Sequence, residues 1–112
     1  MSANPNPGRP VAVAARLRFS DDAVALLRAA VGTEEKKLAL RAAHDELAAT
    51  LVPRLEHLRK DGAIIDFATS WVLEEVVAHA AADRVDLVRN ALASFPELRD
   101  VSTKGLSGHR RR

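Results

Sequence analysis

Residues 62–101 read GAIIDFATSWVLEEVVAHAAADRVDLVRNALASFPELRDV, and the order of elements in this stretch decides the fold. A glycine suited to ending a helix comes first, and two apolar runs follow it, Ala63 to Ala68 and Trp71 to Ala80. Residues 83–95 then carry apolar side chains at helical spacing until a proline stops the pattern. The short apolar segment Leu98 to Ser102 closes the stretch. This order predicts strand, strand, helix and strand.

The second apolar run leaves an alternative open. As a strand, Trp71 to Ala80 places apolar side chains on both of its faces. As a helix, it forms one apolar stripe through Leu73, Val76 and Ala80 that continues into the following helix. Periodicity alone does not separate these two interpretations. We expect the strand, on the resemblance described below, and the alternative is one helix over residues 70–95 in an all-α bundle.

The segment before this stretch begins with a clear strand pattern. Between Val11 and Phe19, every second residue is apolar, whereas Arg16 and Arg18 fall on the opposite face. A period of two with one apolar face is typical of a half-buried strand.

A long helical region lies between that strand and Gly62. Ser20 followed by two aspartates predicts a capped helix start, and Thr33 followed by two glutamates predicts a second one. An apolar stripe with spacings of three and four then runs from Leu40 to Leu58. Pro53 interrupts this stripe, so we expect a kink or a break there. Gly62 is expected to cap the end of the region.

In chain order, the elements are a strand, a helical region, two strands, a helix and a strand. This order is that of an α+β, ferredoxin-like split βαβ fold, here with an enlarged first helical region. We expect an antiparallel sheet with helices on one face and an open second face. Residues 11–102 would form the single globular domain, residues 1–10 a disordered arm and residues 103–112 a flexible tail.

The composition argues against an enzyme. The chain has 112 residues, a net charge of +2 and no cysteine, which excludes disulfides and thiolate metal sites. Glu75 and His79 have no third metal ligand implied beside them, and Ser70 has no glycine-bounded nucleophile turn. We therefore predict no catalytic, metal or cofactor site. No apolar segment has the length of a secretion signal or membrane span, which favours a cytoplasmic protein without membrane contact.

Three segments carry a resemblance to a known family. LAATLVPRLEHLRKDGAII resembles a first helix leading through glycine into a second strand, and FATSWVLEEVVAH resembles a pair of strands. DLVRNALASFPELRDV resembles a second helix and a last strand. Together these segments, from about Leu40 to Val101, resemble the N-terminal propeptide domain of subtilisin-like serine proteases. The helical region 20–60 is longer than that family needs.

The resemblance implies a non-catalytic domain that inhibits a partner protease or assists its folding. In the family, the open sheet face packs on two surface helices of the protease, and acids of the propeptide meet the helix N-termini. The C-terminal segment lies in the substrate cleft. Partner-binding residues are then Trp71, Glu74 and Glu75 on the sheet, and Lys104, Gly105 and Leu106 in the tail.

Two other functions remain open from the residues themselves. The arginines near both ends, including Arg110 to Arg112, suit a small nucleic-acid-binding protein, although aromatic residues for base stacking are missing around them. An open sheet face or a helix stripe also suits a module that forms homodimers or larger homo-oligomers. Nucleic acid is the less expected partner.

Overall fold

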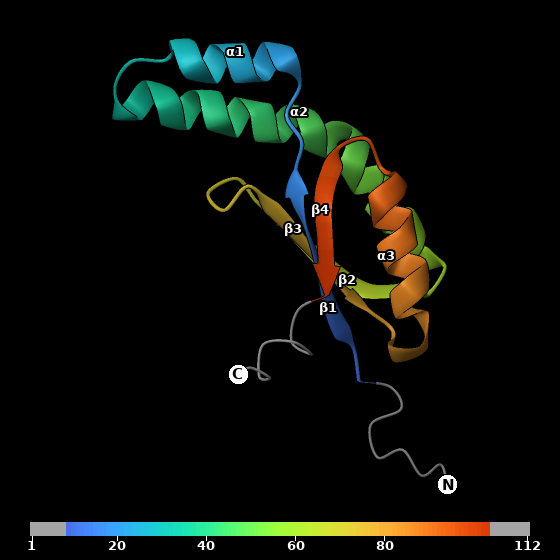
Figure 1. The fold of residues 1–112 in the computed structure, drawn as a ribbon. Helices are drawn as coiled ribbons and strands as arrows, with labels where there is room; N and C mark the ends of the chain where they lie inside the picture. The colour runs from blue at the N-terminus through green and yellow to red at the C-terminus, as the bar shows by residue number, and fades with distance from the viewer. Residues whose placement is uncertain (1–8, 104–112) are drawn as a thin grey trace, which may run out of the picture.

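Residues 9–103 of the computed structural model are described, and they form an α+β fold with helices and a four-stranded antiparallel sheet (Figure 1). The elements in chain order are β1 (Val11–Leu17), α1 (Asp21–Ala29), α2 (Thr33–Lys60), β2 (Ile64–Ser70), β3 (Glu75–Ala80), a 3₁₀ turn (Ala82–Arg84), α3 (Val85–Ser94) and β4 (Leu98–Thr103). The alternative of one helix over residues 70–95 is wrong, because β3 occupies the middle of that range.

The strands lie in the order β2-β3-β1-β4, and each neighbouring pair is antiparallel. β1 and β2 therefore run in the same direction with β3 between them, and β3 and β4 do so with β1 between them. Val13 in the centre of β1 lies opposite Ala78 on one side and Thr103 on the other. The first and the last described strands are thus neighbours.

The connection between β2 and β3 corrects the strand expected within Trp71 to Ala80, which we predict to span Val72 to Ala78. Residues 71–74 form the turn, and β3 begins only at Glu75. The hydroxyl of Ser70 accepts a hydrogen bond from the Leu73 backbone N–H at 3.1 Å, and Glu74 adopts the left-handed region with a φ of 54°. This local bonding reverses the chain and leaves Val72 and Leu73 exposed.

The helix starts follow the predicted positions, with one difference in the capping residue. Ser20 caps α1, because its hydroxyl accepts a hydrogen bond from the Ala23 backbone N–H at 3.1 Å. The prediction that Thr33 caps α2 is wrong, because Thr33 is already helical and Gly32 precedes it without a side-chain cap. Gly32 has a φ of +88°, which a residue without Cβ adopts at little cost.

α2 runs without a break through Pro53, so the expected break is wrong. A proline inside a helix leaves the carbonyl group four residues earlier without its donor. Ala49 and Pro53 both lie on the exposed side of α2, where water can bond that carbonyl group. The opposite side of the helix keeps its apolar contacts, with Leu51 and Leu55 fully buried.

Gly62 ends α2 as expected. Its backbone N–H donates to the carbonyl oxygen of Arg59, and the N–H of Ala63 donates to that of Leu58, both at 3.0 Å. These two bonds, with a φ of +82° at Gly62, form a Schellman motif. The motif turns the chain directly into β2, and Ala63 and Leu58 are both buried beside it.

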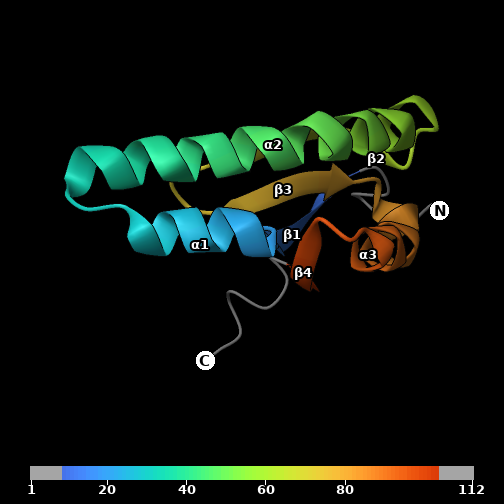
Figure 2. The same ribbon diagram turned by 90° about the horizontal axis from the view of Figure 1, so that it is seen from above.

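Two helices cover one face of the sheet. The second half of α2 and the length of α3 pack on it, while α1 packs along the first half of α2 beyond the sheet (Figure 2). The buried core residues are Val13, Ala15, Leu17, Leu51, Leu55, Leu58, Ala63, Ile64, Val76, Ala78, Ala80, Val88, Leu92 and Leu98. Phe19, Phe67, Val85 and Phe95 pack against this cluster.

A partly buried ion pair joins α2 to the turn before β4. The Arg54 Nε donates to Glu97 Oε2 at 3.2 Å, and the Glu97 side chain is only 6% exposed. In this conformation the Thr50 hydroxyl donates to the Leu47 carbonyl oxygen, which leaves Glu97 Oε1 without a hydrogen bond, whereas the same hydroxyl turned toward Glu97 donates to the carboxylate. Burial raises the pKa of Glu97, but the Thr50 hydroxyl, the Glu97 backbone and Arg54 lower this pKa by more, so its net value lies below the ordinary one.

We expect the core to tolerate truncation far less than the exposed part of the same helix. Leu51→Ala should lower the free energy of unfolding by about 2–5 kcal/mol, because it leaves a cavity under a fully buried side chain. Leu38→Ala in α2 is the matched control, because Leu38 is 70% exposed, and it should change stability by about 0.5 kcal/mol or less. Urea unfolding followed by circular dichroism measures both, and equal losses would refute the described packing.

We also expect Glu97 to stabilise the fold at neutral pH and to lose this effect in acid. Its folded-state pKa lies below the unfolded value, which is about 4.3. The unfolded chain therefore binds the proton first as the pH falls, and the stabilisation disappears as the pH falls through the folded-state pKa. The wild type should exceed Glu97→Gln in stability at pH 7, and the difference should shrink at pH 3. Glu56→Gln, in a surface pair with Arg59, should show a much smaller pH-dependent difference.

Candidate protein-binding face

The sheet face that points away from α2 and α3 is the candidate functional surface, and we call it the open face. Its residues alternate along each strand with the residues of the core, as the pleat of a strand requires. They are Ala12, Ala14 and Arg16 in β1, Asp66, Ala68 and Ser70 in β2, Glu75, Val77 and His79 in β3, and Arg99 and Ser102 in β4.

Small side chains occupy the centre of the open face. Val77 in β3 lies opposite Ala14 in β1 and opposite Ala68 in β2. Ala12 follows next to Ala14 on the same face of β1. No side chain larger than valine rises from this centre, but Ala14 is only 4% exposed and Ala12 and Val77 are half-buried, so another protein can approach the sheet most closely at the exposed Ala68.

Charged side chains lie at the two ends of this small centre. At one end, His79 Nδ1 and the Asp66 carboxylate form a cross-strand pair. At the other end, Arg16 lies opposite both Glu75 and Arg99. A shallow hollow of about 190 Å³ is lined there by Ala14, Ala15, Arg16, Glu75, Asp100 and Ser102. Both signs of charge are therefore present, close to an apolar middle.

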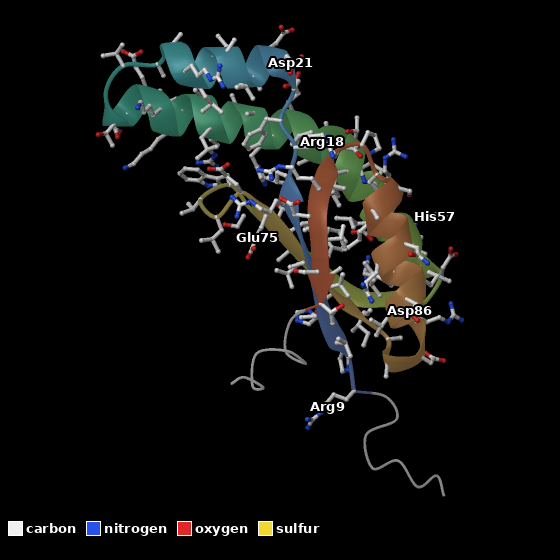
Figure 3. The ribbon with its side chains drawn as sticks, in the orientation of Figure 1. Arg9, Arg18, Asp21, His57, Glu75 and Asp86 are labelled. Atoms are coloured by element: carbon white, nitrogen blue, oxygen red, sulfur yellow. The ribbon has the colours of Figure 1, made fainter. Side chains whose placement is uncertain are left out.

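The predicted partner-binding residues fall in three places. Glu75 is the first residue of β3 and lies on the open face, with its side chain directed away from α3 (Figure 3). Trp71 and Glu74 lie in the turn before β3 rather than in the strand, and both are half-buried. The Glu74 carbonyl oxygen accepts a hydrogen bond from the Leu17 backbone N–H at 2.9 Å, so Glu74 also extends the pairing with β1. Lys104, Gly105 and Leu106 lie outside the described residues.

Sequence reasoning missed Asp66 and Arg99 on this surface. Asp66 lies just after an irregularity in the pairing of β2 with β3, where Ile65 is passed over. An alternating pattern read from the buried Ile64 onwards therefore assigns Asp66 and the residues after it to the wrong face. Only the pairing with His79 reveals that Asp66 belongs to the open face. The pairing of Arg99 with Arg16 likewise assigns Arg99 to the open face.

The pairs considered for chemistry in the sequence are not brought together. The Ser70 hydroxyl accepts from the Leu73 backbone, while His79 is held by Asp66. Glu75 and His79 are four residues apart on one strand, which separates their Cα atoms by about 13 Å. Between residues 9 and 103, no three metal-ligating side chains gather in a cluster.

A second polar group lies between α2 and β2. His44 Nε2 is 2.9 Å from the Thr69 hydroxyl, and His44 Nδ1 is 3.1 Å from the carboxylate of Asp45. The order hydroxyl, imidazole, carboxylate is that of a nucleophile relay, but neither Thr69 nor His44 lines the hollows between α1 and α2, the hollow between α2 and α3, or the hollow beside Arg16. The hydrogen bond between His44 and Thr69 joins α2 to the edge strand β2.

Comparison of the chain with protein-family models, with curated proteins and with solved structures found no match in any of the three. In the part of the chain from Arg9 to Thr103, no helix combines the length and the apolar character that crossing a membrane requires.

Proposed function

We propose that the chain is a non-catalytic protein-binding domain that docks through its open face on a subtilisin-like serine protease and inhibits it or assists its folding. The strand order β2-β3-β1-β4 supports a ferredoxin-like split βαβ arrangement, in which two parallel pairs are each separated by an antiparallel strand. This is the architecture that the resemblance of residues 40–101 to protease propeptides implies. The chain has in addition the long helical hairpin of α1 and α2.

The open face is the observation that carries the proposal. Both α2 and α3 pack on the core face, so no described helix covers the other side of the sheet. A flat apolar centre with charged ends has the composition of a protein interface, in which an apolar middle is surrounded by a polar rim. Nucleic acid is a poorer occupant, because Asp66, Glu75 and Asp100 would repel phosphates beside Arg16 and Arg99.

The chemistry of docking follows from the two kinds of residue on this face. The alanines at the centre let the surface helices of a protease lie close to the sheet. A helix N-terminus presents unpaired backbone N–H groups and a partial positive charge. The carboxylate of Glu75, at the end of the centre, is placed to accept hydrogen bonds from such a terminus, with Glu74 and Trp71 in the adjoining turn.

The same docking accounts for both inhibition and assisted folding. A domain that binds only the native protease stabilises that state by mass action, which favours its folding. Inhibition requires in addition that part of the domain reaches the substrate cleft. β4 is an edge strand that ends at Thr103, and we propose that residues 104–112 continue from there into the cleft. In an extended conformation they can span about 30 Å, and Lys104 and Leu106 would then present side chains to specificity pockets on either side of Gly105.

We expect a bulky charge at the centre of the open face to abolish docking without unfolding the domain. Ala68 is exposed, so Ala68→Arg should leave the melting temperature within about 2 °C while weakening inhibition at least tenfold. Ala93→Arg places the same side chain on the exposed side of α3 and should inhibit like the wild type. The assay is the inhibition constant against a purified subtilisin-like protease. Equal inhibition by both variants, or no inhibition by the wild type, would refute the proposal.

We expect deletion of residues 104–112 to separate docking from inhibition. The truncated protein should still bind the protease, as measured by calorimetry, because the sheet face is intact. It should no longer compete with a peptide substrate, because the extended segment would be missing from the cleft. Unchanged inhibition would remove the cleft-binding role, and a salt-sensitive loss of duplex DNA binding would favour the nucleic-acid alternative.

A further inference from the structure

The helical hairpin of α1 and α2 carries a second apolar surface, which is separate from the open face. α1 packs only along the first half of α2, and together they extend past the sheet (Figure 1). Two large apolar side chains remain uncovered there, Leu26 at 67% exposure and Leu38 at 70%. Neither contributes to the core, and both lie where the two helices meet.

These leucines border a groove between the helices. One hollow of about 440 Å³ is lined by Leu26, Ala29, Ala30, Glu35, Leu38 and Ala39. A second, of about 330 Å³, is lined by Asp22, Ala23, Leu26, Ala39, Ala42, Ala43 and Glu46. The two hollows share Leu26 and Ala39, so they form one continuous trough, which we call the hairpin groove.

The shape of the hairpin groove suits a helix. Its floor on α2 consists of Ala39, Ala42 and Ala43, at spacings of three and four, and on the α1 side Ala23, Ala29 and Ala30 flank Leu26, so small side chains leave room between the two axes. On α2 it extends from Glu35 to Glu46, which corresponds to about 16 Å, or three helical turns. An amphipathic helix of this length would place one apolar stripe between Leu26 and Leu38.

The charges along the groove are all acidic. Asp22 and Glu46 lie at one end of the groove and Glu35 lies at the other. Within residues 9–103, none of these three carboxylates forms an ion pair. The basic residues of the hairpin, Arg28, Lys36, Lys37 and Arg41, are not among the residues that line the groove.

We propose that the hairpin groove binds an amphipathic helix of a partner protein, one with a small apolar stripe and basic residues on its flanks. Basic flanks would neutralise the three acidic side chains, while the stripe would cover Leu26 and Leu38. A second copy of this chain fits poorly, because it would bring the same three acids against their equivalents. The acidic border also disfavours an anionic lipid surface.

The test uses a synthetic helical peptide as the partner. A labelled peptide of about 18 residues, long enough to be helical in water, carries leucine and alanine on one face and lysine on both flanks. We expect it to bind the full chain by fluorescence anisotropy, whereas a shuffled peptide of equal composition, and one with glutamate in place of lysine, should not. Equal binding of the shuffled peptide would overturn the proposal.

Variants locate the binding on the protein. Leu38→Glu, or independently Leu26→Glu, should weaken peptide binding at least tenfold, and Glu46→Lys should weaken it and reduce its salt dependence. Leu87→Glu is the matched control on α3, since Leu87 is also exposed, and it should bind like the wild type. All four positions tolerate charge because they are solvent-exposed, and circular dichroism verifies the fold.

Other occupants of the groove give different results. A dimer seen by sedimentation that Leu38→Glu converts to monomer would assign the groove to a second copy and overturn the proposal. Tenfold tighter peptide binding after deletion of residues 104–112 would assign it to the chain's own C-terminal segment, with the same consequence. Ala68 does not line the hairpin groove, so Ala68→Arg on the open face should leave peptide binding unchanged even where it abolishes docking on the protease.

Discussion

The packing of the second half of α2 on the sheet is the contact on which the rest of this structure depends. Leu51 and Leu55 are fully buried there, among Val13 and Val76 of the central strands. This contact selects the core face of the sheet and thereby determines which face stays open. It also fixes where α2 begins to lose contact with the sheet, because the helix is longer than the strands it covers. The projecting hairpin is the continuation of a helix whose other half is anchored.

The long helix therefore gives one small domain two surfaces of different character. The open face is flat, with alanines in its middle and mixed charge at its ends. The hairpin groove is a trough with leucine sides and acidic ends. Both avoid large exposed apolar areas, since small residues separate the larger ones, and such areas on a free domain promote aggregation. The Schellman motif at Gly62 leads α2 directly into β2, so the helix that carries the groove continues into the sheet that carries the open face.

Much of this architecture could be predicted from the sequence, and the exceptions have physical causes. Alternation in Val11 to Phe19 identified the central strand, because that strand has one buried face. The sequence favours a strand at residues 71–74, where the structure has a turn. The spacing of the apolar side chains in this segment does not distinguish a turn from an edge strand. Pro53 predicts a kink or a break. α2 nevertheless continues through it, because burial of its apolar side chains stabilises the helix by more than one lost hydrogen bond on its exposed side costs. Glu75 lies on the open face, and the positions of Asp66 and Arg99 there depend on strand pairing, which residues on one strand alone do not encode.

The position of β1 has a consequence for how the chain is made. β1 is the first described strand, yet both of its neighbours, β3 and β4, come from the second half of the chain. During synthesis on the ribosome, β1 can therefore complete its pairing with β4 only after Thr103 has emerged. The two hairpins, α1 with α2 and β2 with β3, are local in sequence and can form earlier. The nascent chain would then carry a preformed helical arm, which a cellular factor can meet while the sheet is still incomplete.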